Sequence, residues 1–169
     1  MPQGTEEILR KSYLFAKLSN EELSEVAKVL REETYEPGAY VVKEGDPGES
    51  LYLVAAGGVN VTKEPDNHFL SYLGAGGYFG EMALFLPNSR RTASCVAMLK
   101  TTCLILEKSA LEGFCLSRPA IGVKIYQEII RALAERLAAT SADLAMLMKS
   151  QVSKQDQVSE MAAAFRNRK

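Results

Sequence analysis

Residues 76–94 read GGYFGEMALFLPNSRRTAS, and this short stretch changes from strand to helix and back to strand. The glycines that open it end one β run, and a group of good helix formers follows Gly80. Pro87 ends that helix because proline cannot continue it, and a polar turn then leads through arginine into a second β run. The stretch therefore predicts one helical turn inserted between two strands of a β domain.

The same stretch has the residues of an anion-binding site. The first N–H groups of a helix lack partners within the helix and lie at the positive end of its dipole, so they can bind phosphate oxygens. Gly80 has no Cβ to block close approach, and Arg91 can return across the hairpin to form charge-assisted hydrogen bonds with the same anion. In the simpler interpretation, Gly80 only makes a turn, and Glu81 and Arg91 form only a structural ion pair.

Glu81 gives the expected anion a more definite chemistry. A carboxylate beside a phosphate raises the energy unless it engages another group, and an ionised carboxylate can only accept hydrogen bonds. A ribose 2′-OH is a donor at a suitable distance from a sugar phosphate. The residues alone therefore predict a ligand that is a sugar phosphate or a nucleotide with a free 2′-OH.

Around this stretch, from Tyr35 to Glu107, the hydrophobic pattern has a period of about two residues. Short β-rich runs are separated by Pro, Gly, Asp and Asn at intervals of about ten residues, which is typical of an antiparallel sandwich or roll. We expect an α+β fold whose centre is an antiparallel, jelly-roll-like β-roll over residues 33–108.

Helical patterns flank the β region. Apolar residues at helical spacing predict two short helices within residues 6–31, and Ser19 with Glu22 resembles a capping box that opens the second. A short helix is expected over 109–115. After Pro119 a long helix is expected, since no Pro or Gly occurs from Val123 to the last residue.

The long helix carries residues at alternating steps of four and three, as in a coiled-coil seam. Its first half has two interpretations: this face packs on the roll, or it self-associates. Beyond Leu144 the helix should extend past the roll, which favours a homodimer. We expect residues 1–150 to form one domain and 151–169 to form a helical or frayed tail. The seam comprises Tyr126, Ile130, Leu133, Leu137, Thr140, Leu144, Leu147 and Gln151.

Composition excludes several classes of function. The chain has 20 Lys and Arg against 21 Asp and Glu, so its charge indicates neither nucleic acid nor an anionic membrane as a partner. A single histidine disfavours most zinc and iron sites, and the three cysteines lack metal-ligand spacing. No signal peptide or membrane span is expected. We expect a cytoplasmic protein with reduced cysteines, no cofactor and no enzymatic activity.

Two segments of the sequence resemble a known protein family. FGEMALF (79–85), the proline at 87 and RTAS (91–94) resemble the phosphate-binding cassette of cyclic nucleotide-binding domains. That family is shared by catabolite activator proteins, kinase regulatory subunits and gated channels. EPGAYVVKEGDPGESLYLVAAGGVNV (36–61) is similar to the family's opening strands, and the likeness covers about residues 10–150.

The resemblance implies a role for each cassette residue. The backbone amides of Gly80 and Met82 would bind the cyclic phosphate, and Glu81 would hold the ribose 2′-OH. Arg91 would pair with the phosphate, and the Thr92 hydroxyl would reach the phosphate or the base. The full set implied at phosphate and ribose is Gly80, Glu81, Met82, Ala83, Arg91, Thr92 and Ala93.

Further residues are implied at the base and along the pocket wall. FLSYL (69–73) resembles the strand before the cassette of the bacterial activators, and LAERLAATSADL (133–144) resembles their helix that meets the adenine. The helix segment is about four residues longer than in those activators. Other members of the family use a helix arginine against the base, so the resemblance makes Arg131 a second candidate. Val61 and Leu70 could instead be core residues, and Thr140 could set coiled-coil register. The implied set is Val61, Leu70, Ser71, Phe79, Arg136, Thr140 and Ser141.

The expected ligand is cAMP rather than cGMP. Thr92, directly after the arginine, accompanies cGMP in some relatives, whereas the Thr140–Ser141 pair favours cAMP. No DNA-binding module is expected, so the signal would pass through self-association, the tail or another protein. We expect a sensor whose C-terminal helix shifts on ligand binding. The alternatives are a scaffold with a degenerate pocket that self-associates through the long helix, and a binder of a non-nucleotide effector.

Overall fold

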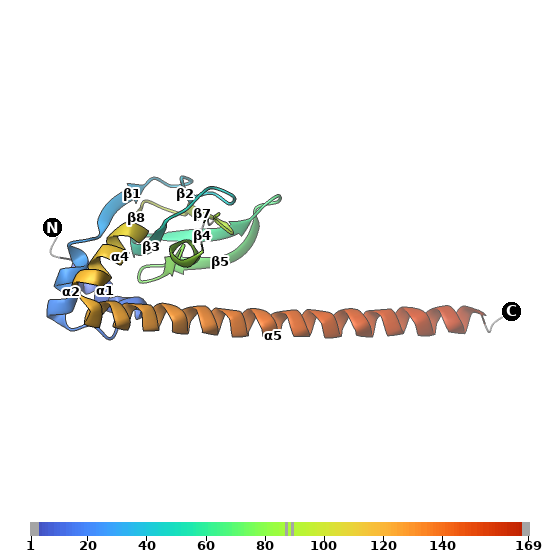
Figure 1. Ribbon diagram of the computed structural model, residues 1–169. Coiled ribbons are helices and arrows are strands. Elements are labelled where there is room, and N and C mark those ends of the chain that lie inside the picture. Colours follow the sequence, from blue (N-terminus) through green and yellow to red (C-terminus); the bar gives the residue numbers. More distant parts are fainter. Residues whose placement is uncertain (1–3, 87, 89, 167–169) are drawn as a thin grey trace. The chain divides into compact units, whose positions relative to one another are not determined.

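The computed structural model describes residues 4–86, 88 and 90–166 (Figure 1). The chain divides into two compact units, one that ends at Ile129 and one that begins at Ile130. The first unit contains all the strands and the short helices. The second is the continuation of the last helix.

The strands confirm the predicted antiparallel β-roll, which consists of two four-stranded sheets. The orders are β1-β8-β3-β6 and β2-β7-β4-β5, and every pairing between named strands is antiparallel. The strands are β1 Arg31–Tyr35, β2 Tyr40–Val42, β3 Ser50–Ala56, β4 Gly58–Lys63, β5 His68–Gly74, β6 Tyr78–Phe79, β7 Ser94–Ala97 and β8 Thr101–Glu107.

The helices are short except for the last. They are α1 Thr5–Lys11, the 3-10 turn η1 Tyr13–Phe15, α2 Asn20–Ala27, α3 Met82–Phe85, α4 Lys108–Ser117 and α5 Pro119–Arg166. The capping box of α2 is present: Ser19 Oγ accepts from the Glu22 N–H, and the Glu22 carboxylate accepts from the Ser19 N–H. The helical turn expected after Gly80 is α3, and Leu86 caps it.

The N-terminal boundary differs from the prediction. Helix was expected to reach residue 31, but α2 ends at Ala27 and β1 begins at Arg31, before the expected start of the roll at residue 33. The sequence of β1 is REETY, an edge strand paired only with β8 and largely exposed. Because none of the residues of β1 is fully buried, its sequence lacks apolar alternation.

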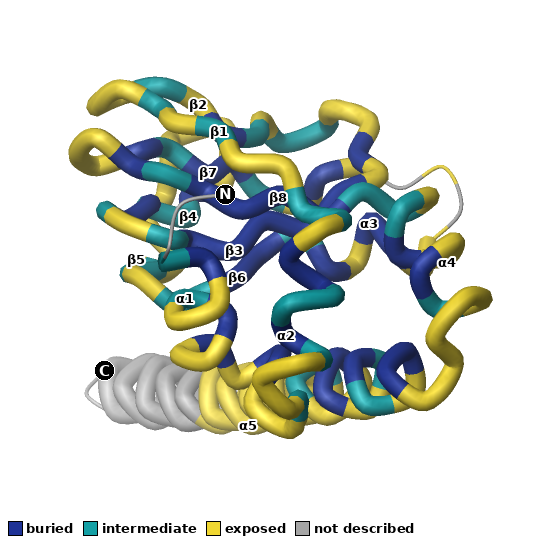
Figure 2. The backbone as a smooth tube through the Cα atoms, turned by 90° about the vertical axis from the view of Figure 1, so that its left-hand side faces the viewer, coloured by how far each residue is buried: buried dark blue, intermediate teal, exposed yellow. Residues whose placement is uncertain are grey.

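Buried apolar side chains from both sheets form the core of the roll. In the backbone view of Figure 2, the buried residues of the strands are dark blue. The core includes Cys95 and Cys103, and both are free thiols. Burial raises the pKa of each to about 12, so they remain protonated and unreactive near neutral pH. The buried members of this cluster are Val41, Tyr52, Val54, Val59, Phe79, Cys95, Cys103 and Ile105.

Ion pairs join the N-terminal helices to the end of α4 and the start of α5. Glu22 accepts from Lys124 at 2.7 Å, and Glu25 accepts from Arg118 at 2.6 Å. Lys17 lies 2.8 Å from the carboxylate of Glu128, which is buried on α5. The exposed cation thus offsets part of the cost of burying the carboxylate.

From Ile130 onward α5 forms the second unit, and its apolar side chains between Ile130 and Lys149 are largely exposed. They include Ile130, Leu137, Leu144, Leu147 and Met148. Of the predicted tail, residues 151–166 belong to α5 and residues 167–169 lie outside the described part of the chain.

The described residues contain neither a candidate membrane span nor a candidate metal-binding cluster. Among the helices within residues 4–166, apart from the positions left out, none has an apolar stretch long enough to span a bilayer. Within the same residues, no group of three or more His, Cys, Asp or Glu could hold a metal ion.

Candidate functional site

The cassette begins where β6 turns into α3. Gly80 follows Phe79 with a φ of +81°, a conformation that residues with a Cβ rarely adopt. Its carbonyl accepts from Ala83 N–H at 3.1 Å, and the Glu81 carbonyl accepts from Leu84 N–H at 3.1 Å. The chain therefore enters α3 directly after the glycine.

Gly80 also permits a close approach to Arg91. A Cβ at this position would lie 2.6 Å from Arg91 Nη1 and 2.8 Å from the carbonyl oxygen of Ser50. Both distances are too short for a real contact, so a side chain at residue 80 would displace the guanidinium or strand β3. Glycine is therefore required at residue 80 for two reasons: the positive φ, and the short distances to Arg91 and Ser50.

Arg91 is held inside the domain, with a relative exposure of 8%. Its Nη1 donates to the Ser50 carbonyl at 2.8 Å, and its Nη2 donates to Ser50 Oγ at 3.1 Å. The guanidinium also lies over the ring of Tyr52, 5.4 Å from its centroid, and Tyr52 stacks on Phe79. Strand β3 therefore fixes the orientation of this cation before any ligand is considered.

The backbone of Arg91 is fixed as well. Its N–H donates to the Asp46 carbonyl at 2.8 Å, and its own carbonyl accepts from the Gly45 N–H at 2.9 Å. Gly48, in the same loop, passes so close that a Cβ there would lie 2.3 Å from Arg91 Nε. The loop before β3 thus contacts both the main chain and the side chain of Arg91.

Glu81 is buried beside this cation, with a relative exposure of 4%. The pKa of the Cys95 thiol depends on both charged groups. Burial raises this pKa, the nearby Arg91 cation acts to lower it, and the Glu81 carboxylate acts to raise it further. Glu81 and Arg91 therefore both lie near Cys95.

The remaining cassette residues differ in exposure. Met82 and Thr92 are exposed, Ala93 is half-buried and Ala83 is buried. The Thr92 carbonyl accepts from Lys63 Nζ at 2.8 Å, and Lys63 is the last residue of β4. The cassette segment after Arg91 is thus tied to the second sheet.

The predicted wall residues fall into two groups. Val61 pairs with Ser71 on one side and with Cys95 on the other, so these strands bring the wall next to the buried charges. Val61 is half-buried and packs against the core cluster, whereas Leu70 and Ser71 on β5 are exposed. Phe79 is buried in that cluster beneath Tyr52, so its side chain serves the core.

The predicted base-contacting residues lie in the second unit. Arg136, Thr140 and Ser141 are exposed on α5. Thr140 Oγ donates to the Arg136 carbonyl at 2.9 Å, which places these two residues one helical turn apart. Their contact with a base stays a prediction.

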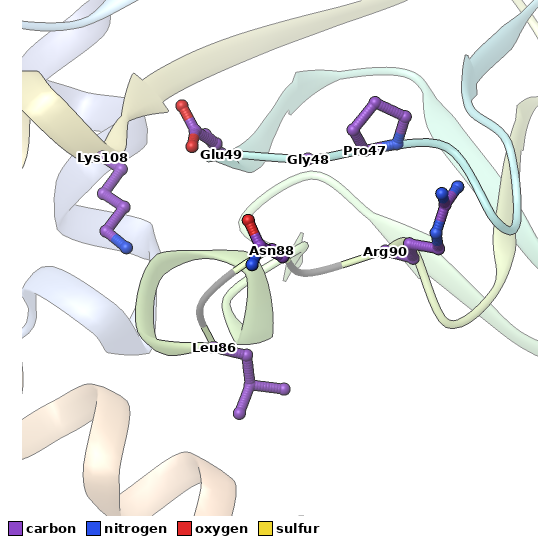
Figure 3. Close-up of a pocket in the computed structure, with 7 residues that line it drawn as sticks. All are labelled: Pro47, Gly48, Glu49, Leu86, Asn88, Arg90 and Lys108. Carbon is purple, nitrogen blue, oxygen red and sulfur yellow. The ribbon is translucent and has the colours of Figure 1, made fainter.

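A hollow of about 480 Å³ is lined partly by the loop before β3 and partly by residues that follow α3 (Figure 3). None of the predicted ligand-binding residues lines it, so it is not the nucleotide site that the sequence indicates. Gly48 contacts Arg91 and also lines this hollow. The lining residues are Pro47, Gly48, Glu49, Leu86, Asn88, Arg90 and Lys108.

Sequence reasoning missed the residues that hold the cassette in place. Ser50, Tyr52 and Gly48 lie about forty positions before Arg91 in the chain, and Lys63 lies on another strand. No local pattern links residues that far apart. The glycine-rich turn before β3 was visible, but its contact with Arg91 was not.

Comparison with known proteins gives concordant results. The sequence model described as "Cyclic nucleotide-binding domain" matches residues 32–118. The chain is 29% identical over 150 residues to a CRP-like cAMP-activated global transcriptional regulator of Mycobacterium tuberculosis, covering 87% of this chain and 65% of that protein. It is 36% identical over 107 residues to a cAMP-dependent protein kinase regulatory subunit of Colletotrichum orbiculare, covering 63% of this chain and 27% of that protein.

Solved structures show the same similarity. Thermus thermophilus catabolite activator protein matches with a TM-score of 0.72 and 31% identity, covering 80% of this chain and 63% of that one. A cyclic nucleotide-binding domain from Methylobacillus flagellatus matches with a TM-score of 0.70 and 31% identity, covering 81% and 78%. The chain thus spans less than two thirds of the activator's length and most of the isolated domain.

A pair of glycine variants tests the close approach at Gly80. Gly38 has the same φ of +81°, but no atom lies within 4 Å of the point that a Cβ would occupy there. Gly38→Ala should lower the free energy of unfolding by about 1–2 kcal/mol through backbone strain alone. Gly80→Ala should lower it by about 1–3 kcal/mol more, because Arg91 and Ser50 must also move. Urea denaturation followed by circular dichroism measures both; equal losses would show that the approach is not tight.

Proposed function

Because the chain belongs to the cyclic nucleotide-binding domain family, we propose that it is a regulatory sensor that binds cAMP in preference to cGMP and shifts α5 on binding. The observation that carries this proposal is the buried guanidinium of Arg91, held by Ser50 beside Gly80 and Glu81. A buried cation is costly to keep unless an anion or a full set of acceptors satisfies it. A cyclic phosphate monoanion would provide that anion.

Different residues of the cassette would bind different parts of the ligand. The planar fork of Arg91 suits two phosphate oxygens, and Ser50 already orients it, so little rotamer entropy would be lost on binding. The amides of Gly80 and Met82 would bind the same group, while the Ala83 N–H already donates to the Gly80 carbonyl. Glu81 would accept the ribose 2′-OH, which lies beside the cyclic phosphate in such a ligand.

The base would lie against the second sheet, and α5 would close over it on binding. Val61 and the exposed Leu70 and Ser71 offer an apolar wall with a hydroxyl at the edge of the β4–β5 pair. Arg136, Thr140 and Ser141 would approach the other side of the purine from α5. The adjacent hydroxyls of Thr140 and Ser141 favour adenine in this proposal, while Thr92 leaves some affinity for cGMP.

The signal would be a population shift in the position of α5. A ligand can move this equilibrium only by the difference between its affinities for the open and closed arrangements. The first turns of α5 are tied to the N-terminal helices through Lys124 and Glu128, so they form the fixed end of the helix. The domain would bind and release the nucleotide unchanged, in the cytoplasm, without catalysis.

Arginine variants test the phosphate contact. Arg91→Ala should weaken cAMP binding by at least about 100-fold, because a bidentate charge-assisted contact is lost. Arg91→Lys should recover little, since an ammonium cannot reproduce the planar fork. Isothermal titration calorimetry gives the dissociation constants.

Arg90→Ala is the matched control, because Arg90 is exposed and its Nη1 donates to the Gly45 carbonyl. It should bind cAMP nearly as the parent does. Unchanged affinity in both Arg91 variants, with circular dichroism showing intact folds, would remove the phosphate site. Mass spectrometry of the compounds that copurify with the protein would then identify a non-nucleotide effector, or find none and favour the scaffold.

The sugar contact is tested with 2′-deoxy-cAMP. The parent should prefer cAMP by about 10- to 100-fold, since the deoxy ligand lacks the hydroxyl that would donate to the buried carboxylate of Glu81. Glu81→Ala should bring the two affinities close together, whereas Glu112→Ala, an exposed carboxylate on α4, should leave the preference intact. Competition binding with a fluorescent cyclic nucleotide measures the ratio. A preference that survives Glu81→Ala would exclude Glu81 from the sugar site.

We also propose a homodimer through α5. Ile130, Leu137 and Leu144 are exposed at intervals of one heptad, and Leu147 continues the seam. Leu137→Asp combined with Leu144→Asp should convert the dimer to a monomer in sedimentation velocity. Leu116→Asp, at an exposed leucine on α4, should not change the mass of the species. A parent protein that sediments as a monomer with and without cAMP would contradict the dimer.

A further inference from the structure

The end of β4 contacts the cassette through one side chain. The ladder between β4 and β7 ends at the pair of Thr62 with Ser94, so Ala93 and Thr92 have already left the sheet. Beyond that pair, Lys63 Nζ reaches across and donates to the Thr92 carbonyl at 2.8 Å. A side-chain hydrogen bond thus holds the segment at Thr92, where the backbone hydrogen bonds between β4 and β7 have ended.

Lys63 is itself held in this position. Its Nζ lies 2.7 Å from Glu44 Oε1, and the other oxygen of Glu44 accepts from the Glu64 N–H at 3.0 Å. The N–H of Glu44 donates to Ser94 Oγ at 3.0 Å, which closes the network on β7. The interaction with Lys63 keeps the pKa of Glu44 below its usual value, so this carboxylate is ionised near neutral pH.

The bond to the Thr92 carbonyl also fixes the next amide. The peptide between Thr92 and Ala93 is planar and trans, so its C=O and its N–H point to opposite sides. With the carbonyl turned toward Lys63, the Ala93 N–H is turned away from it. Within the described residues, this N–H has no backbone or side-chain acceptor.

We propose that Lys63 is a positioning residue for the phosphate, which sets the Thr92–Ala93 peptide so that the Ala93 N–H donates to an exocyclic oxygen of the cyclic phosphate. The inference rests on the proposed function and adds a residue from outside the cassette to it. A cation on the carbonyl also polarises the peptide, which makes its N–H a stronger donor.

The ion pair between Lys63 and Glu44 contributes little to the stability of the fold. The Lys63 side chain is 47% exposed, and ion pairs of that kind contribute little to folding. Its removal should therefore change ligand binding while leaving the fold intact. This separation makes the inference testable.

The experiment compares Lys63→Met with Lys100→Met. Lys100 is an exposed lysine that pairs with Glu36 at 3.7 Å near the turn between β7 and β8, so the control removes the same charge from a different site. Lys63→Met should weaken cAMP binding by about five- to ten-fold in calorimetry, and Lys100→Met should leave it unchanged. Lys63→Arg should recover most of the affinity, since a guanidinium can donate to both Thr92 and Glu44. Thermal unfolding midpoints of all three should agree within about 2 °C.

A second readout distinguishes positioning from a general loss of positive charge. The two phosphorothioate diastereomers of cAMP each replace one exocyclic oxygen by sulfur, a poorer acceptor. In the parent, one diastereomer should bind more weakly because it places sulfur at the Ala93 N–H. Lys63→Met should reduce that penalty and should leave the preference for ribose over 2′-deoxyribose unchanged, because Glu81 is untouched.

The outcomes separate this inference from the proposed function. If the parent binds cAMP and Lys63→Met binds it equally well, Lys63 has no role at the site, although the sensor proposal stands. If Lys63→Met weakens both diastereomers and cAMP by the same factor, the lysine acts only through its charge and the positioning role is wrong. A parent that binds no cyclic nucleotide overturns the proposed function, and this inference with it.

Discussion

The contact between Arg91 and Ser50 is the constraint on which the rest of the cassette depends. A guanidinium within the domain must have its N–H groups satisfied, and β3 supplies one carbonyl and one hydroxyl for this purpose. To admit that side chain, the backbone must be bare at Gly80 and Gly48. The position of one cation therefore determines the residue types at several distant places in the chain.

The two sheets contribute differently to this arrangement. Strand β3, from one sheet, orients the guanidinium, while β4, from the other, holds the carbonyl of Thr92 through Lys63. The cassette is thus tied to both sheets. A ligand bound there would interact with a segment whose two ends are each anchored in regular structure.

Sequence patterns predicted the parts of this structure that depend on neighbouring residues. The capping box at Ser19, the helical turn after Gly80 and the alternation of the roll are all local, and each has a specific residue signature. The predicted start of β1 was wrong because an exposed, charged edge strand carries no apolar alternation. Ser50 and Lys63 were missed for a different reason: their partners are distant in the chain, and only the fold brings them together.

The ion pairs at the start of α5 bear on how this domain can be shortened. The matched family region covers residues 32–118, yet Lys17, Glu22 and Glu25 precede it, and Lys124 and Glu128 follow it. A fragment trimmed to the matched region would lose both the N-terminal helices and the first turns of α5. One trimmed at the N-terminus alone would leave a buried carboxylate on α5 without its lysine. The compact unit that these ion pairs join extends through Ile129, beyond the stretch by which the family is recognised.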